Sequence, residues 1–233
     1  MRFRCTVFLM SLLASLNGMP SLAGQALHFQ ATEANRVFEP LIVNTLARAG
    51  YEMTVSFAPL TRMQLGLRNN TIDGVFFIGE DSLAVGKGIK IPVVLYTNEV
   101  VALSLNPGII IHQASDLQRW RVAVLRGNAS QAKLTKGMAV TETDSYETSV
   151  KMLRAGHCDI VITSRLLVYS LIKQFELKDW TVHEPPLSSY PLFVALAPGQ
   201  RDLVPALTQI FQGAVDRGEW QRSLDAVLDR PTR

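Results

Sequence analysis

The chain has 233 residues, 48% of them hydrophobic and 18% charged, and its formal net charge is +3 at pH 7. A chain of this length can bury a core large enough to fold without disulfide bonds. The near balance of charge argues against nucleic-acid binding, so we expect no nucleic acid among its partners.

The first 23 residues have the pattern of a secretory signal. Arg2 and Arg4 form a basic start, residues 7–16 are apolar, and small residues at Ser21 and Ala23 stand where a signal peptidase reads. The apolar run is well short of the roughly 20 residues that a membrane-spanning helix needs. We therefore predict a cleaved signal over residues 1–23 and a periplasmic location for the rest of the chain.

Cleavage defines the mature chain. A cut after Ala23 removes two arginines and lowers the net charge from +3 to +1, and a second site follows Ala26. Cys5 precedes the apolar run, whereas a lipid-carrying cysteine would follow it, so we expect no lipid anchor. Cys158 is then the sole cysteine, which excludes an intramolecular disulfide and indicates a small buried hydrophobe.

The pattern of apolar residues predicts strands and helices in regular alternation after the signal. The predicted strands are 27–31, 51–57, 75–78, 93–104, 121–125, 140–143, 160–163 and 191–197. The predicted helices are 38–49, 59–68, 115–118, 129–136, 145–154, 164–175, 202–215 and 218–228. Ser145 has the residue type of a helix N-cap, and so do Asn128 and Ser130. This alternation is typical of an α/β fold.

One short phrase occurs twice. Residues 67–77 and 153–163 both begin with Leu-Arg, continue through a turn to an Asp at the same offset (Asp73 and Asp159), and end in an apolar strand. A helix that ends in a turn and passes into a buried strand is half of a βαβ unit. Two copies predict two α/β lobes of similar construction, and a cleft between lobes is a favoured place for a small ligand.

The connection between the lobes is predicted from what the sequence lacks. No Gly/Ser-rich linker separates the two halves, so we expect extended strands near 97–105 and 188–195 to cross between them. The second lobe, residues 102–194, would then be inserted into a first lobe made of residues 24–101 and 195–233. The carboxyl-terminal helices would pack back on the first lobe.

The chain resembles the bacterial extracellular solute-binding proteins of family 3, the type II periplasmic proteins that deliver polar amino acids to importers. The segments that carry the resemblance follow the family's order, and they are 27–31, 57–62, 71–74, 116–127, 144–147, 158–161 and 218–221. The resemblance implies a two-lobed monomer that closes over a small molecule. Its partner would be the membrane permease of an ABC importer or a membrane sensor.

The ligand-reading positions depart from that family. Its amino-acid binders carry an Arg a dozen residues after the first turn Asp, but residues 80–87 contain none, and Lys87 is the nearest cation. They also place an acid after the second-lobe strand, where this chain has Thr163-Ser164-Arg165. Both charge partners of a zwitterion are missing, so we do not expect a standard α-amino acid as the ligand.

Cleft positions follow from strand ends and from the resemblance. The candidate ligand-binding residues are Glu33, Asn35, Leu60, Phe77, Ile78, Gly79, Glu80, Arg126, Asn128, Ala129, Ser130, Thr163 and Tyr190. Each has a plainer interpretation: a solvated loop for Glu33 and Asn35, a core contact for Leu60, or a solvated turn for Glu80. Arg126 beside the turn into the next helix predicts an anion site, and therefore a carboxylate-bearing ligand.

Catalysis has little support in the sequence. None of the four histidines has metal-ligand spacing to another His or Cys, and no nucleophile elbow or phosphate loop occurs. We expect a binding protein with no cofactor. Two alternatives stay open: a periplasmic sensor or accessory protein, and a dehydratase acting on prephenate-like acids with Glu33, Glu80 or Asp81 as the acid.

Overall fold

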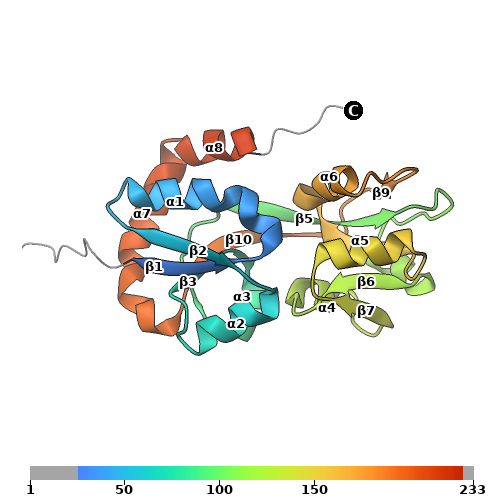
Figure 1. Ribbon diagram of the computed structural model, residues 1–233, viewed down its shortest axis with the longest axis horizontal. Helices are drawn as coiled ribbons and strands as arrows, with labels where there is room; N and C mark the ends of the chain where they lie inside the picture. The colour runs from blue at the N-terminus through green and yellow to red at the C-terminus, as the bar shows by residue number, and fades with distance from the viewer. Residues whose placement is uncertain (1–25, 228–233) are drawn as a thin grey trace, which may run out of the picture.

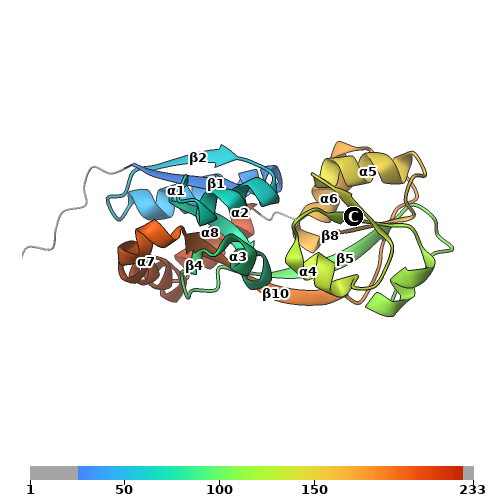
Figure 2. The same cartoon turned by 90° about the horizontal axis from the view of Figure 1, so that it is seen from below.

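The structure is a computed structural model that describes residues 26–227, so the predicted signal at 1–23 lies outside it. Within these residues, no helix has both the length and the apolar character needed to cross a bilayer. Figures 1 and 2 show two bodies side by side, joined by two long strands.

One bent sheet runs through both bodies, in the strand order β2-β1-β3-β10-β5-β8-β6-β7. Its strands are β1 (Leu27–Ala31), β2 (Met53–Phe57), β3 (Gly74–Gly79), β5 (Tyr96–Ser104), β6 (Val122–Leu125), β7 (Val140–Thr143), β8 (Ile160–Ser164) and β10 (Ser188–Leu196). Parallel pairs occupy the two ends, and antiparallel pairs involving β10 and β5 occupy the middle. Two short strands, β4 (Ile89–Lys90) and β9 (Thr181–Val182), pair with β10 and β5.

The helices cover the sheet separately in the two bodies (Figure 1). The body named here the first lobe holds β1 to β4 with η1 (Glu33–Phe38), α1 (Glu39–Ala47), α2 (Leu60–Arg68), α3 (Glu80–Gly86), η3 (Pro198–Leu203), α7 (Val204–Asp216) and α8 (Glu219–Val227). The second lobe holds β6 to β9 with η2 (Ala114–Arg119), α4 (Ala129–Leu134), α5 (Tyr146–Arg154) and α6 (Arg165–Gln174).

Strands β5 and β10 carry the chain from one lobe to the other and back. They pair antiparallel from Tyr96 opposite Leu192 to Val100 opposite Ser188. Beyond this shared stretch, β10 pairs with β3 of the first lobe and β5 pairs with β8 of the second. Helices α7 and α8 both contact α1, so the end of the chain packs on the first lobe. The predicted insertion of one lobe into the other is the observed topology.

The repeated phrase has the same structural role in both lobes. The carboxylate of Asp73, just before β3, accepts a hydrogen bond from the backbone N–H of His28 in the neighbouring strand at 2.7 Å. The carboxylate of Asp159, just before β8, accepts one from the N–H of Arg121 at 3.0 Å. Each Asp therefore fastens the turn that precedes a parallel strand to the strand beside it.

Sequence and structure differ most around the ends of β1 and β3. No helix or strand was predicted over residues 33–37 or 80–86, where the structure has the 3-10 helix η1 and the helix α3. Phe77 also departs from strand alternation, because its φ is +55° and the pairing of β3 with β10 shifts register nearby. The shift lets Phe76 and Phe77 enter the same aromatic core of the first lobe.

Candidate functional site

The crevice between the lobes is closed on one side by direct polar contacts. The side-chain amide of Gln64 on α2 donates to the backbone carbonyls of Ser82 at 3.1 Å and of Gly127 at 3.0 Å. The Ser82 hydroxyl accepts a hydrogen bond from the backbone N–H of Ala129 at 3.2 Å. We call these four residues the polar lobe contact. It joins α2 and α3 of the first lobe to the turn before α4 of the second.

The backbone at Gly127 makes this approach feasible. Its φ is +76°, a conformation that residues with side chains adopt at a cost. A Cβ placed there would lie 2.6 Å from the Thr61 methyl carbon of the first lobe. Glycine at this position thus serves both the local turn and the close contact between the two lobes.

Other predicted site residues lie beside the polar lobe contact. A Cβ on Gly79 would meet the Tyr190 ring at 2.8 Å, so the two pack closely. Asn128 and Ser130 approach the Tyr190 hydroxyl, while burial raises the pKa of that phenol. The Asn128 side chain caps α4, as predicted, by accepting from the N–H of Gln131 at 3.1 Å. These residues are brought together, but they mainly contact one another.

Apolar side chains continue the contact into the middle of the crevice. Leu60 and Ile78 from the first lobe belong to the same buried cluster as Leu125 and Tyr146 from the second. Leu60 is 8% exposed and Ile78 only 2%, so both act as core residues between the lobes. The plainer interpretation of Leu60 as a core contact agrees with this placement.

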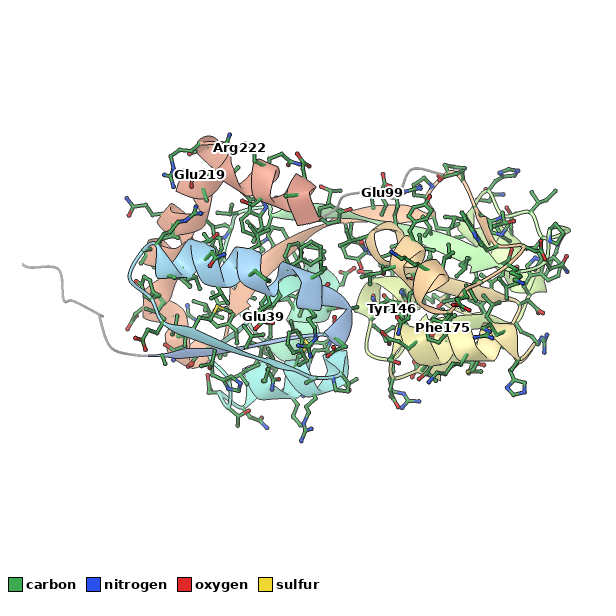
Figure 3. The ribbon with its side chains drawn as sticks, turned by 45° about the horizontal axis from the view of Figure 1, so that its top comes forward. Glu39, Glu99, Tyr146, Phe175, Glu219 and Arg222 are labelled. Atoms are coloured by element: carbon green, nitrogen blue, oxygen red, sulfur yellow. The ribbon has the colours of Figure 1, made fainter. Side chains whose placement is uncertain are left out.

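A cavity of about 240 Å³ occupies the other side of the crevice, and we call it the cleft cavity. Both lobes line it: the first supplies Thr32, Glu33, Ala34, Phe57, Ala58 and Pro59, and the second supplies Leu125, Asp144, Ser145, Tyr146 and Glu147. The lining includes three carboxylates and no Lys, Arg or His. Figure 3 shows Tyr146 on the side of the second lobe that faces the first.

Local structure fixes the second-lobe wall of the cleft cavity. Ser145 is the N-cap of α5, as predicted, and its hydroxyl accepts from the N–H of Thr148 at 3.1 Å. The cap places Tyr146 and Glu147 in the first turn of the helix. The Tyr146 hydroxyl accepts a hydrogen bond from the buried Gln131 amide at 3.1 Å, and burial raises the pKa of Tyr146. The ring is thus held in place from within the second lobe.

The first-lobe wall is organised by Arg36. Its guanidinium forms two hydrogen bonds with the Glu33 carboxylate, at 2.5 and 2.9 Å, and these bonds lower the pKa of Glu33. The same guanidinium lies 3.8 Å from the centre of the Phe57 ring. Glu33 is therefore neutralised locally, and Phe57 offers an aromatic surface beside it.

The expected anion site at Arg126 is not formed in this geometry. The Arg126 guanidinium turns to the carboxylates of Glu142 at 3.3 Å and Asp144 at 2.8 Å, all within the second lobe. The N–H groups at the start of α4 are also engaged, since Ala129 donates to Ser82 and Gln131 to Asn128. A carboxylate held at this turn therefore stays a prediction, and in this geometry Arg126 and the N–H groups of Ala129 and Gln131 already have partners within the protein.

Three further candidates lie outside the lining of the cleft cavity. Phe77 packs against Phe38 with ring centroids 4.3 Å apart, inside the first-lobe core. Asn35 lies over the same strand end and its amide donates to the Phe77 carbonyl at 3.5 Å. Glu80 is exposed and pairs with Lys90 at 2.7 Å. The plainer interpretation of Glu80 as a solvated residue fits this position.

Thr163 is buried at the carboxyl end of β8. In residues 26–227, its hydroxyl is the one fully buried side-chain N or O atom with no hydrogen-bond partner. The pairing of Ala123 with Val161, continued by two residues, places Thr163 beside Leu125 on the same face of the sheet. Leu125 lines the cleft cavity, whereas Thr163 is not among the residues that line it.

Several residues of the site were not predicted. The sequence gives no signal that Gln64 and Ser82 contact the other lobe. In the sequence, a Gln that becomes buried on a helix cannot be distinguished from a Gln on the surface. Phe57, Tyr146 and Glu147 line the cleft cavity. For the last two, the N-cap at Ser145 was a usable signal, because it marks a helix start that follows a strand end.

Comparison with known proteins shows the fold. No family model matches the chain, and no curated protein matches its sequence. A solved substrate-binding protein of an amino acid ABC transporter superposes with a TM-score of 0.76 at 14% identity, over 88% of this chain and 100% of that one. A mutant of ArgBP from T. maritima gives 0.76 at 16% identity, over 88% and 96%. A histidine kinase sensor domain with similarity to periplasmic binding proteins gives 0.77 at 13% identity, over 86% and 94%.

These likenesses agree with the two lobes, the crossing strands and the inserted second lobe described above. The fold is that of the type II periplasmic binding proteins.

Proposed function

We propose that this chain is a periplasmic solute-binding protein that captures a small polar ligand by closing its two lobes and presents it to a membrane transporter. The cleft cavity supports the proposal best, because residues of both lobes line it and a ligand inside would bridge them. Its volume of about 240 Å³ lies just below the range of about 300–1,000 Å³ typical of ligand pockets, so the ligand should be small. A molecule that contacts both lobes favours the closed over the open arrangement, which is how such proteins signal occupancy.

A rigid-body motion about the crossing strands fits the topology. We propose that residues 24–101 and 195–233 move as one lobe and residues 102–194 as the other, with β5 and β10 as the connection. The paired stretch from Tyr96 to Val100 opposite β10 connects the lobes through the sheet, so a bend there would separate them at the polar lobe contact and the apolar cluster. The protein would act as a monomer, because its two lobes supply all the residues of the site.

A sensor or accessory role is the second candidate. The likeness to a histidine kinase sensor domain, at a TM-score of 0.77, shows that the same fold occurs in a signalling protein. In that case a membrane signalling partner would read the closed arrangement. An enzyme on this fold has less support, since the pKa of Glu33, one of the three acids named for it, is lowered, whereas a general acid needs a raised pKa.

A stability screen of the purified mature protein tests the proposal. Amino acids, organic acids and amines would be added singly, and a ligand at 100 times its dissociation constant would raise the unfolding free energy by about 2.7 kcal/mol. Small-angle scattering of the same samples would follow lobe closure. A panel in which no compound stabilises the protein would contradict the proposed function.

Export is tested separately. The mature protein recovered from the periplasm is expected to begin at Gly24 or Leu27 and to carry no lipid. Recovery of protein that still begins with Met1 would contradict the proposed location.

A further inference from the structure

We propose that the cleft cavity binds an organic cation, with an ammonium or guanidinium group held by Glu147 and an apolar body packed between Phe57 and Tyr146. The inference rests on the proposed function and names the chemistry of its ligand. It differs from the sequence-based expectation of a carboxylate-bearing ligand, which depended on Arg126.

The charge of the lining favours a cation. Three carboxylates border the cavity, and two of them already have partners: Glu33 pairs with Arg36, and Asp144 pairs with Arg126. Glu147 is half-buried and forms no ion pair or hydrogen bond with any residue in the described range 26–227. An unpaired carboxylate in a partly desolvated site is stabilised by a positive charge that enters beside it.

Glu147 lies in the wall of the cavity, at the start of a helix. It lies in the first turn of α5, a helix of nine residues, where the helix dipole stabilises a negative side chain. Tyr146 before it is fixed through its hydroxyl to Gln131. The carboxylate is therefore presented from a rigid helix start, whereas the two paired acids have their charge neutralised.

The second lobe also contains the buried hydroxyl of Thr163, which has no hydrogen-bond partner within residues 26–227. It is fully buried without a partner, although a lone buried polar group destabilises a fold. Its side chain lies next to Leu125, which belongs to the cavity lining. Thr163 is not itself among the residues that line the cavity, so the cation is assigned to Glu147 alone, and a carboxylate ligand would face Glu147 with like charge.

Aromatic and apolar groups form the rest of the walls. Phe57 and Tyr146 stand on opposite lobes, and Ala58, Pro59 and Leu125 lie between them. The Phe57 ring already accepts the Arg36 guanidinium, which shows that this surface tolerates a planar cation. The ligand should therefore combine one cationic group with an apolar stem or ring.

Titration calorimetry on the mature protein at pH 7 tests the inference with matched probes. Butylamine, agmatine and phenethylamine are protonated at this pH. Pentanoate is the anionic counterpart of butylamine, and 2-phenylethanol and 3-phenylpropionate are the neutral and anionic counterparts of phenethylamine. We expect at least one amine to bind, at least tenfold more tightly than its counterpart. Glu147→Gln should weaken that binding at least tenfold, since it removes the charge and keeps the shape.

A control variant separates this effect from a general change in surface charge. Glu52→Gln removes an equal charge just before the first residue of β2, whereas Phe57 is the last residue of that strand. This variant should change the affinity less than twofold. Binding of the acids in place of the amines, or an unchanged affinity in Glu147→Gln, would overturn the inference while leaving the proposed function standing. A protein that binds no compound of this set or of the wider screen would remove both.

Discussion

The two sides of the crevice have opposite chemistry. On the α3–α4 side, neutral polar groups of one lobe fill the hydrogen-bonding positions of the other, through Gln64, Ser82 and the turn at Gly127. On the other side, carboxylates and aromatic rings surround a cavity and one acid has no partner. We propose that the first side holds the lobes together, while the second side selects the ligand.

In the proposed function, the balance between these two sides decides how the protein responds to ligand. A strong polar lobe contact favours closure without ligand, and a ligand then adds only the contacts of the cleft cavity. A weak one leaves the lobes apart until ligand binds. Mutations on the two sides should therefore be distinguishable. A change in the polar lobe contact should alter the separation of the lobes, and a change in the cleft cavity should alter the affinity for ligand.

The largest effect is expected from Gly127→Ala. The new alanine would have to adopt a φ near +76°, and its Cβ would lie 2.6 Å from the Thr61 methyl carbon. The closed arrangement should therefore lose about 3 kcal/mol of stability. Small-angle scattering should show a larger radius of gyration than for wild type. Gly137→Ala is the matched control, because Gly137 has φ of +82° with nothing within 4 Å, and it should leave the radius unchanged. Equal behaviour of the two variants would show that the close approach at Gly127 does not matter.

Gln64→Ala should have the next largest effect. It leaves the carbonyls of Ser82 and Gly127 without their shared donor, which we expect to weaken the closed arrangement by about 2 kcal/mol. The closed-to-open ratio would fall about 30-fold, since each 1.4 kcal/mol is a factor of ten. Gln212→Ala is the control, because it removes an exposed amide that donates to Asp216 on the same helix. It should change neither the radius of gyration nor the free energy of unfolding. A Gln64→Ala protein as closed as wild type would mean that the apolar cluster alone holds the lobes.

A smaller effect of opposite sign is expected at Thr163. Thr163→Val removes a buried hydroxyl that has no partner, so the unfolding free energy without ligand should rise by about 1 kcal/mol. Binding of the amine should change less than twofold in the same variant, because Thr163 is not among the residues that line the cavity. Thr143→Val is the matched change at a buried hydroxyl that bonds Ser149 at 2.6 Å, and it should lower stability. Urea denaturation of both variants would decide, and a loss of stability in Thr163→Val would contradict this account.

Most of the fold could be predicted because its elements are apolar and periodic. The strands 27–31 and 140–143 have the predicted limits, and the repeated Asp73 and Asp159 marked two equivalent turns. Helix α3 was missed because its sequence begins Glu-Asp-Ser and buries few side chains. The 3-10 helix η1 was missed because short helices lack a full period of apolar residues.

The candidate site was harder to predict because its residues meet only in three dimensions. Arg126 was placed in an anion site, but the parallel pairing of β6 with β7 puts Val124 opposite Glu142 and Leu125 opposite Thr143. Glu142 and Asp144 therefore flank the Arg126 side chain and pair with it. The sequence shows these charges eighteen residues apart at most, and strand register alone brings them together.

The central claim is that the closed lobes hold an organic cation on the Glu147 side of the crevice. A crystal structure of the protein with its tightest-binding amine tests it most directly. The account predicts the charged nitrogen within about 3 Å of a Glu147 carboxylate oxygen, with the Gln64 amide still bonded to the Gly127 carbonyl. A ligand seated instead at the turn of Arg126 to Ser130, with the polar lobe contact separated, would contradict it.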